Sequence, residues 1–212
     1  MRYLPVVGLV LLTLTGCQSA YYNAMEKVGI HKRDIMVDRV EAAAESQEEA
    51  QEQFTSALDS LKALTHFDGG ELEEMYNEIN SQYEASEDAV EDVQSRISAV
   101  EDVSDALFAE WEDELSLYKS ATLRRDSAQK LKITKSHYAS MLRAMKRAEA
   151  KMVPVLDTLR DNALYLKHNL NAAAIGSLKG EFANLERDIQ QAIRQMETAI
   201  HESNRFIKTL KS

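Results

Sequence analysis

The chain has 212 residues, enough for one sizeable domain or an elongated bundle, and a formal net charge of −10 from 35 acidic against 25 Lys and Arg side chains. The acidic balance argues against a nucleic-acid partner, and the single cysteine excludes a disulfide within the chain. Ala, Glu, Leu, Lys and Gln dominate, and only two prolines and seven glycines occur, so the composition predicts nearly all helix.

The first seventeen residues follow the pattern of a bacterial lipoprotein export signal. Arg2 supplies a positive start, an apolar run extends to Leu14, and Thr15 and Gly16 provide small residues before Cys17. We therefore predict a signal peptide over residues 1–16 and acylation of Cys17, including palmitate. The alternative is a retained membrane helix, but a span needs about 20 apolar residues, and polar side chains follow the cysteine directly.

The predicted location is the bacterial cell envelope. Several acyl chains on one cysteine make attachment to a membrane effectively permanent. Gln18 follows the cysteine where lipoproteins retained in the inner membrane commonly carry Asp, in the pattern that this segment resembles. We expect an outer-membrane lipoprotein facing the periplasm, with residues 17–23 as the acylated tether and residues 24–212 as a helical bundle.

The first predicted helix covers about residues 24–65. Its apolar positions are spaced three and four apart, with Gln47 and Gln51 interrupting the stripe. The stripe consists of Val37, Val40, Ala44, Phe54, Leu58 and Leu61. Gly69 and Gly70 then tolerate the backbone of a tight turn, which predicts a helical hairpin.

The second predicted helix, about residues 71–119, carries the clearest periodicity in the chain. Alternating steps of four and three from Leu72 to Tyr118 give fourteen positions, of which eleven are apolar or aromatic. A heptad stripe held over six repeats must be covered by partner helices. Because such a stripe could also pair between chains, a homo-oligomer stays open.

Two further helices are predicted over about residues 126–171 and 177–211. Asp126 or Ser127 could cap the third helix, and the alanine run after Asn171 leaves open whether helices three and four are separated by a turn or continuous. The prediction is an all-α fold, an elongated antiparallel helical bundle or coiled coil of about four long helices.

Charge divides the chain unequally. Residues 17–118 carry a net charge of −20, whereas residues 119–212 carry +9. One interpretation is internal, with acidic helices against basic helices. The other is that the stretch Lys119–Lys151 binds an anionic envelope glycan or lipid, or an acidic partner protein. The candidate contacts are Arg124, Arg125, Lys130, Lys132, Lys135, Arg143, Lys146, Arg147 and Lys151.

The sequence predicts no enzyme. None of the five histidines has a second histidine at the four-residue spacing of a helical metal site. Glu197 and His201 stand four apart with no second such pair, and the spacing of Met141, Met145 and Met152 is that of a core stripe rather than of copper ligands. We predict no catalytic residue, no metal and no cofactor.

Four segments resemble a family of uncharacterised bacterial lipoproteins that is catalogued only as a domain of unknown function. They are Tyr21–Lys27, Lys32–Val40, Ala148–Leu156 and Leu166–Ala172. The resemblance spans essentially the whole mature chain. It implies a helical coiled-coil architecture and an envelope location, and it implies no activity or ligand.

The last of these segments contains a cluster of polar residues near a predicted turn, namely Lys167, His168, Asn169 and Asn171. They would cap the backbone at the turn or recognise a partner. The expected function is that of a non-enzymatic scaffold, spacer or adaptor anchored through Cys17. The alternative is a binding module for an anionic ligand or acidic partner through Lys119–Lys151.

Overall fold

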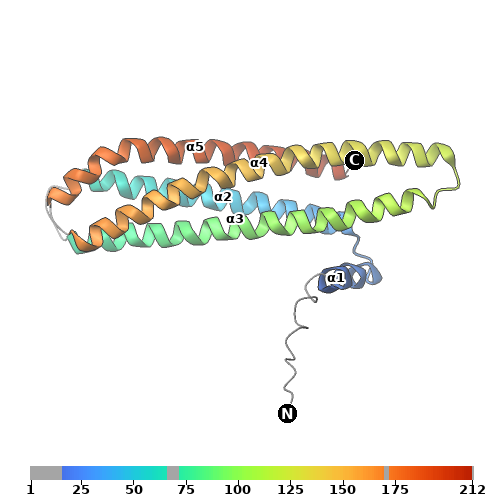
Figure 1. The fold of residues 1–212 in the computed structure, drawn as a ribbon, viewed down its shortest axis with the longest axis horizontal. Coiled ribbons are helices and arrows are strands. Elements are labelled where there is room, and N and C mark those ends of the chain that lie inside the picture. The colour runs from blue at the N-terminus through green and yellow to red at the C-terminus, as the bar shows by residue number, and fades with distance from the viewer. Residues whose placement is uncertain (1–15, 66–71, 170–171, 212) are drawn as a thin grey trace, which may run out of the picture.

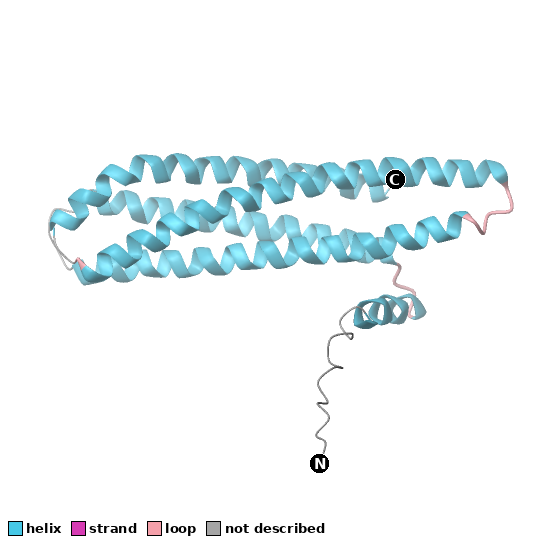
Figure 2. Ribbon diagram, in the orientation of Figure 1, coloured by secondary structure: helices cyan, strands magenta, loops and turns pink. Residues whose placement is uncertain are grey.

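The computed structural model describes residues 16–65, 72–169 and 172–211, which contain five helices and no strand (Figure 2). The helices are α1 (Gly16–Lys27), α2 (Lys32–Thr65), α3 (Leu72–Leu115), α4 (Ala121–His168) and α5 (Ala172–Lys211). The predicted all-α fold is confirmed.

The four long helices form one elongated antiparallel bundle (Figure 1). Each of α2 to α5 packs against its neighbour in chain order, and α5 also packs against α2, which closes the ring. The α3/α4 hairpin extends past the end of α5, and the short helix α1 lies outside the bundle near the beginning of α2. Neighbours in sequence are therefore neighbours in space, as short connections between antiparallel helices require.

The heptad stripe that the sequence predicts lies in the core, and α2 and α4 pack against α3 on either side of it. The stripe is buried from Ile79 to Leu107 apart from the partly buried Tyr83, and it is exposed at Glu114 and at Tyr118, just past the end of α3. The partner helices contribute fully buried Phe54, Met145 and Phe206, among others. Each large apolar side chain removed from water contributes about 1.5–3 kcal/mol to folding.

The predicted beginning of the first long helix is wrong. Residues 17–23, expected to form a tether, belong to α1, and α2 begins at Lys32 rather than near residue 24. Gly29 has a φ of +85°, a conformation that glycine adopts without strain. The backbone amide of Gly29 donates to the Glu26 carbonyl at 3.0 Å, and the amide of Ile30 donates to the Met25 carbonyl at 3.1 Å. This arrangement is the Schellman motif that ends a helix.

The predicted boundaries of the later helices also need correction. α3 ends at Leu115 instead of residue 119, and α4 begins at Ala121 because Ser120 caps it, accepting from the Leu123 amide at 3.4 Å. Ser127 is no cap: it is buried and accepts a bond from Trp111 Nε1 at 2.8 Å.

The alanine run after residue 171 is helical, so α5 begins at Ala172 instead of residue 177. Alanine has the highest helix propensity. α4 ends at His168 instead of residue 171. α4 and α5 are separate helices, and they pack against each other.

Gln47 interrupts the core as it interrupts the sequence pattern. It is fully buried, and neither Nε2 nor Oε1 has a hydrogen-bond partner among the described residues. An amide buried without a partner costs about 1–3 kcal/mol. We expect Gln47→Met, which keeps the volume and removes the amide, to raise the free energy of unfolding by about this amount, measured by urea denaturation followed by circular dichroism.

The control for Gln47→Met is Gln129→Met, an exposed position on α4, where little change is expected. Equal or lower stability of the Gln47→Met variant would contradict the prediction and would indicate that the amide is satisfied in solution.

Candidate functional site

One lysine bridges α1 and the bundle. The Lys32 side chain is 9% exposed, and its Nζ donates to Glu26 of α1 and, at 2.8 Å, to Glu110 of α3. Burial lowers the pKa of Lys32, but the two carboxylates outweigh burial and raise it overall. The bond from Lys32 lowers the pKa of Glu26, whereas burial raises that of Glu110. The lysine therefore stays charged and ties α1 to α2 and α3.

Cys17, the predicted lipidation site, lies in the first turn of α1. Residues 1–15 of the predicted signal peptide lie outside the described residues. Tyr22 is buried, and Met25 packs against the core. The predicted attachment point is thus separated from the bundle by one docked helix.

The nine candidate cationic residues of the basic stretch all lie on α4, but they do not act alike. Lys135 bonds to Glu112 at 2.6 Å and Lys146 to Glu101 at 3.1 Å, both on α3, and Lys130 pairs with Asp126 on α4. The other six form no ion pair within the described part of the chain; they are Arg124, Arg125, Lys132, Arg143, Arg147 and Lys151. Most of the stretch is therefore free to meet an external anion.

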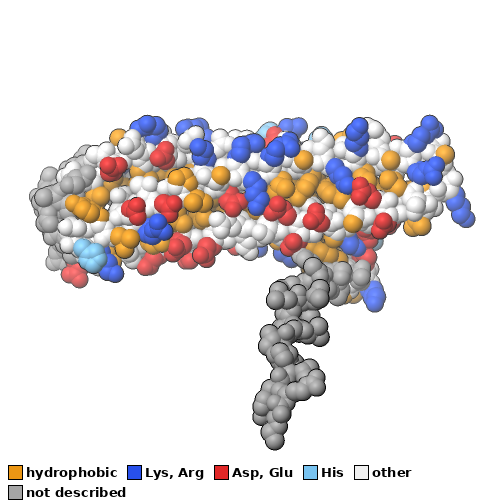
Figure 3. Space-filling view, viewed as in Figure 1, with side chains coloured by type: hydrophobic (Ala, Val, Ile, Leu, Met, Phe, Trp, Pro, Cys, Tyr) orange, Lys and Arg blue, Asp and Glu red, His pale blue; other side chains and the backbone are white. Residues whose placement is uncertain are grey.

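The distribution of charge over the helices explains this excess. α2 and α3 are acidic, whereas α4 carries most of the positive charge of residues 119–212, because α5 has six basic against five acidic side chains. α4 packs against one acidic helix, α3, where Lys135 pairs with Glu112, and against the nearly neutral α5. Lys211–Glu41 joins α5 to α2. In Figure 3, Lys and Arg gather along the upper margin over α4 and α5 and at the hairpin tip, whereas Asp and Glu lie lower.

Apolar side chains are exposed beside the cations at the tip of the α3/α4 hairpin. Leu117 is 75% exposed and Leu123 58% exposed, and both flank the exposed Lys119. Arg124 and Arg125 follow in the first turn of α4. This combination of apolar and cationic groups is suited to a membrane surface or a partner protein.

The predicted polar turn lies at the end of α4. Asn169 is the C-cap of α4. The backbone amide of Asn169 donates to the Leu166 carbonyl at 3.1 Å, and the side-chain Nδ2 donates to the Tyr165 carbonyl at 2.9 Å. Lys167 and His168 are exposed, and Asn171 lies outside the described residues. For Asn169 the capping interpretation accounts for the side chain; the role of the others as partner contacts stays a prediction.

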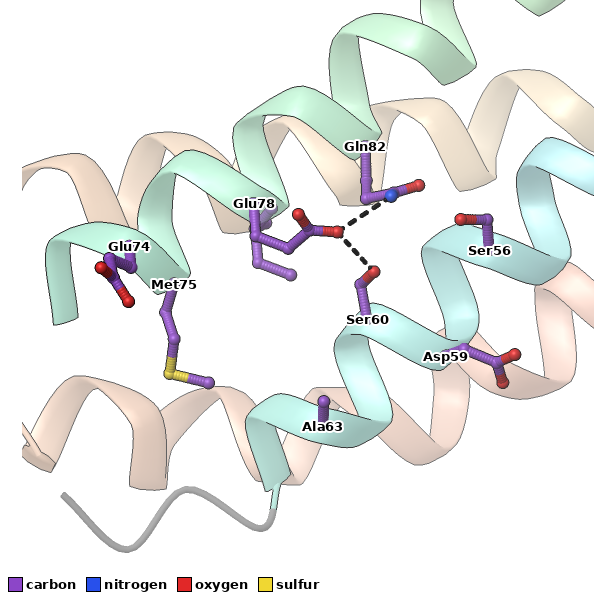
Figure 4. A pocket seen from close by; sticks show the side chains of 9 residues that line it. Ser56, Asp59, Ser60, Ala63, Glu74, Met75, Glu78 and Gln82 are labelled. Atoms are coloured by element: carbon purple, nitrogen blue, oxygen red, sulfur yellow. Dashed lines mark hydrogen bonds between the residues drawn. The ribbon is translucent and has the colours of Figure 1, made fainter. Parts of the chain in front are cut away.

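A groove of about 770 Å³ lies between the C-terminal half of α2 and the beginning of α3 (Figure 4). Its central acidic group is Glu78, which accepts bonds from Gln82 at 3.0 Å and Ser60 at 2.8 Å. The bonds from Gln82 and Ser60 lower the pKa of Glu78. Two side chains of the groove therefore favour the charged form of this carboxylate.

A smaller cleft of about 240 Å³, which we call the α4/α5 cleft, was not predicted from the sequence. It is lined by Ser136, His137, Ser140 and Arg143 of α4 and by Glu202, Arg205 and Thr209 of α5. Only Arg143 is among the predicted site residues, because the others become neighbours only through the antiparallel register of the two helices. His137 Nδ1 lies 2.9 Å from Thr209 Oγ1 and marks this register.

Within the described ranges, no group of three or more His, Cys, Asp or Glu side chains could hold a metal ion. None of the described helices is both long and apolar enough to cross a membrane.

The fold and surface define an all-α protein, an elongated four-helix bundle with segregated surface charge. A family model described as Protein of unknown function (DUF2959) matches residues 21–210, and the chain belongs to this family. No curated protein and no solved structure matches the chain. The resemblance to a domain of unknown function is confirmed, and the lipoprotein character stays a prediction.

The Lys32 bridge predicts how α1 is released. Lys32→Met leaves Glu26 and Glu110 close together without a counter-ion, which is strongly unfavourable for partly buried carboxylates. We expect the amides of α1 to exchange hydrogen at least about tenfold faster, corresponding to about 1.4 kcal/mol of lost docking energy, as measured by mass spectrometry.

Lys27→Met is the matched control for Lys32→Met, since it removes the same charge from an exposed position in the last turn of α1. Unchanged exchange in the Lys32→Met variant would show that apolar contacts alone hold α1.

Proposed function

We propose that the protein is a non-enzymatic lipoprotein of the bacterial envelope that acts as a scaffold, spacer or adaptor. The observation that carries the proposal is the contact of α1, which contains Cys17, with a long bundle through Tyr22, Met25 and the Lys32 ion pairs. α4 alone has 48 residues, which corresponds to about 70 Å at 1.5 Å per residue. A lipid on Cys17 would thus be joined through the Lys32 bridge to a rod that holds its surface at a defined position relative to the membrane.

The proposed anchor is a set of acyl chains, palmitate included, on Cys17, and the proposed location is the periplasmic face of the outer membrane. The apolar run before Cys17 and the small residues next to it support acylation. Gln18 supports transfer to the outer membrane.

Two variants test the anchor and its destination separately. Cys17→Ser should abolish labelling by radioactive palmitate, because the only thiol in the chain is lost. Gln18→Asp should keep the label and move the protein to the inner membrane, as measured by sucrose-gradient separation of the two membranes. Labelling of Cys17→Ser would contradict acylation, and an unchanged location of Gln18→Asp would contradict the sorting.

The second candidate function is binding of an anionic envelope ligand or an acidic partner through Lys119–Lys151. Two observations favour this function. Six cations of this stretch form no ion pair among the described residues, and Leu117 is exposed at the hairpin tip. Exposed cations that lack partners within the protein attract anions over about 8–10 Å at physiological salt.

Photo-crosslinking in living cells tests this second function. A probe at Leu123, between the cationic residues of the tip, should give a reproducible protein, glycan or lipid adduct, identified by mass spectrometry. A probe at Glu48, exposed on acidic α2, is the matched control and should give none. The same adducts from both probes, or crosslinks only within the chain, would contradict a ligand-binding role of the stretch.

A further inference from the structure

We infer that the α4/α5 cleft binds a phosphate group. The inference deepens the second function proposed above and rests on it, because it assigns one specific site within the basic surface. The candidates are a phosphate in a lipid headgroup and a soluble phosphate.

Donors converge on the cleft from both helices. Arg143 of α4 has no hydrogen-bond or ion-pair partner within the described ranges, and the same is true of the hydroxyls of Ser136 and Ser140. Arg205 contributes a second guanidinium from α5, 59% exposed. Guanidinium groups bind phosphate oxygens with paired, charge-assisted hydrogen bonds, so the cleft offers a phosphate cationic donors on opposite sides.

Core contacts next to the cleft hold α4 and α5 in one register. Tyr138 and Phe206 each follow a cleft residue in the sequence, and their rings lie 6.0 Å apart. Phe206 is fully buried, and the ring of Phe108 on α3 makes an edge-to-face contact with Tyr138, with the ring centroids 5.3 Å apart. Because packed aromatic rings fix the register of α4 against α5, the two backbones from which the donors extend need little reorganisation on binding.

Glu202 distinguishes this cleft from a general basic surface. Its carboxylate lines the cleft and bonds to Arg205 at 2.9 Å. A bound phosphate must therefore share Arg205 with a like charge, which weakens its binding. If the cleft is the site, the removal of Glu202's charge strengthens binding, an effect that a purely structural role of Glu202 does not produce.

The position of the cleft agrees with either phosphate source. Thr209 lies two residues before Lys211, which pairs with Glu41 near the beginning of α2. The cleft thus belongs to the half of the bundle to which α1 is attached, and a lipid on Cys17 would keep it close to headgroups. It is also open to soluble phosphates.

The test uses the purified protein in a neutral detergent, titrated with inorganic phosphate and, separately, with dihexanoyl phosphatidylglycerol below its micelle concentration. Binding is followed by the amide NMR shifts of the cleft residues. Arg143→Gln should weaken binding at least about tenfold, as expected for the loss of charge-assisted bonds. Glu202→Gln should strengthen it several-fold.

Each variant has a control with the same charge change outside the cleft. Arg147→Gln lies one turn further along α4, and Glu197→Gln lies on the exposed surface of α5; both should change the affinity by no more than about twofold. Response to the lipid as well as to inorganic phosphate identifies a headgroup as the source, and response to inorganic phosphate alone identifies a soluble one.

Two results would overturn the inference. Equal losses in Arg143→Gln and Arg147→Gln would assign binding to the basic surface as a whole, and the second function would survive without this site. Absence of any phosphate response in the unaltered protein would exclude the site, and the crosslinks at Leu123 would then decide the second function independently.

Discussion

Burial of one continuous apolar stripe on α3 is the constraint on which the rest of the structure depends. A stripe that repeats every 3.5 residues from Ile79 to Leu107 can be covered only by helices that follow it over its whole length. α2 and α4 flank α3, and α5 closes the ring between them. With no disulfide available within the chain, this packing must supply the stability, which explains why even the methionines of α4 are fully buried.

The same constraint determines where the charges can act. Since the interior is filled by apolar side chains, most charged groups lie on the surface, and that surface is acidic over α2 and α3 and basic over α4. Ion pairs between the described parts of the long helices join α2 to α3, α3 to α4 and α2 to α5, and they neutralise only some of these charges. Ion pairs at exposed positions contribute about 0–1 kcal/mol each, so folding does not require the unpaired cations of α4. They leave α4 with an unbalanced positive surface that stands apart from the packing of the core.

The features that could be predicted from the sequence are those that local periodicity encodes. The apolar stripes predict the fold class and the four long helices, and Gln47 stands out in the sequence as an interruption of the first stripe. The end of α1 could have been found from Gly29, but a continuous helical composition on both sides masks a single glycine. Ser120 was missed because Asp126 and Ser127 offered equally good capping chemistry.

The α4/α5 cleft shows why surface sites are harder to predict than the core. His137 and Thr209 are separated by 72 positions in the sequence, and they become neighbours only when the antiparallel register of two helices is fixed. A shift of α5 by one helical turn, about 5.4 Å, would leave both core stripes facing each other but would separate Arg205 from Arg143. The spacing of the apolar stripes alone is therefore compatible with registers that the cleft is not. The ring contact between Tyr138 and Phe206 selects among these registers, and a core residue thereby determines the geometry of a surface site.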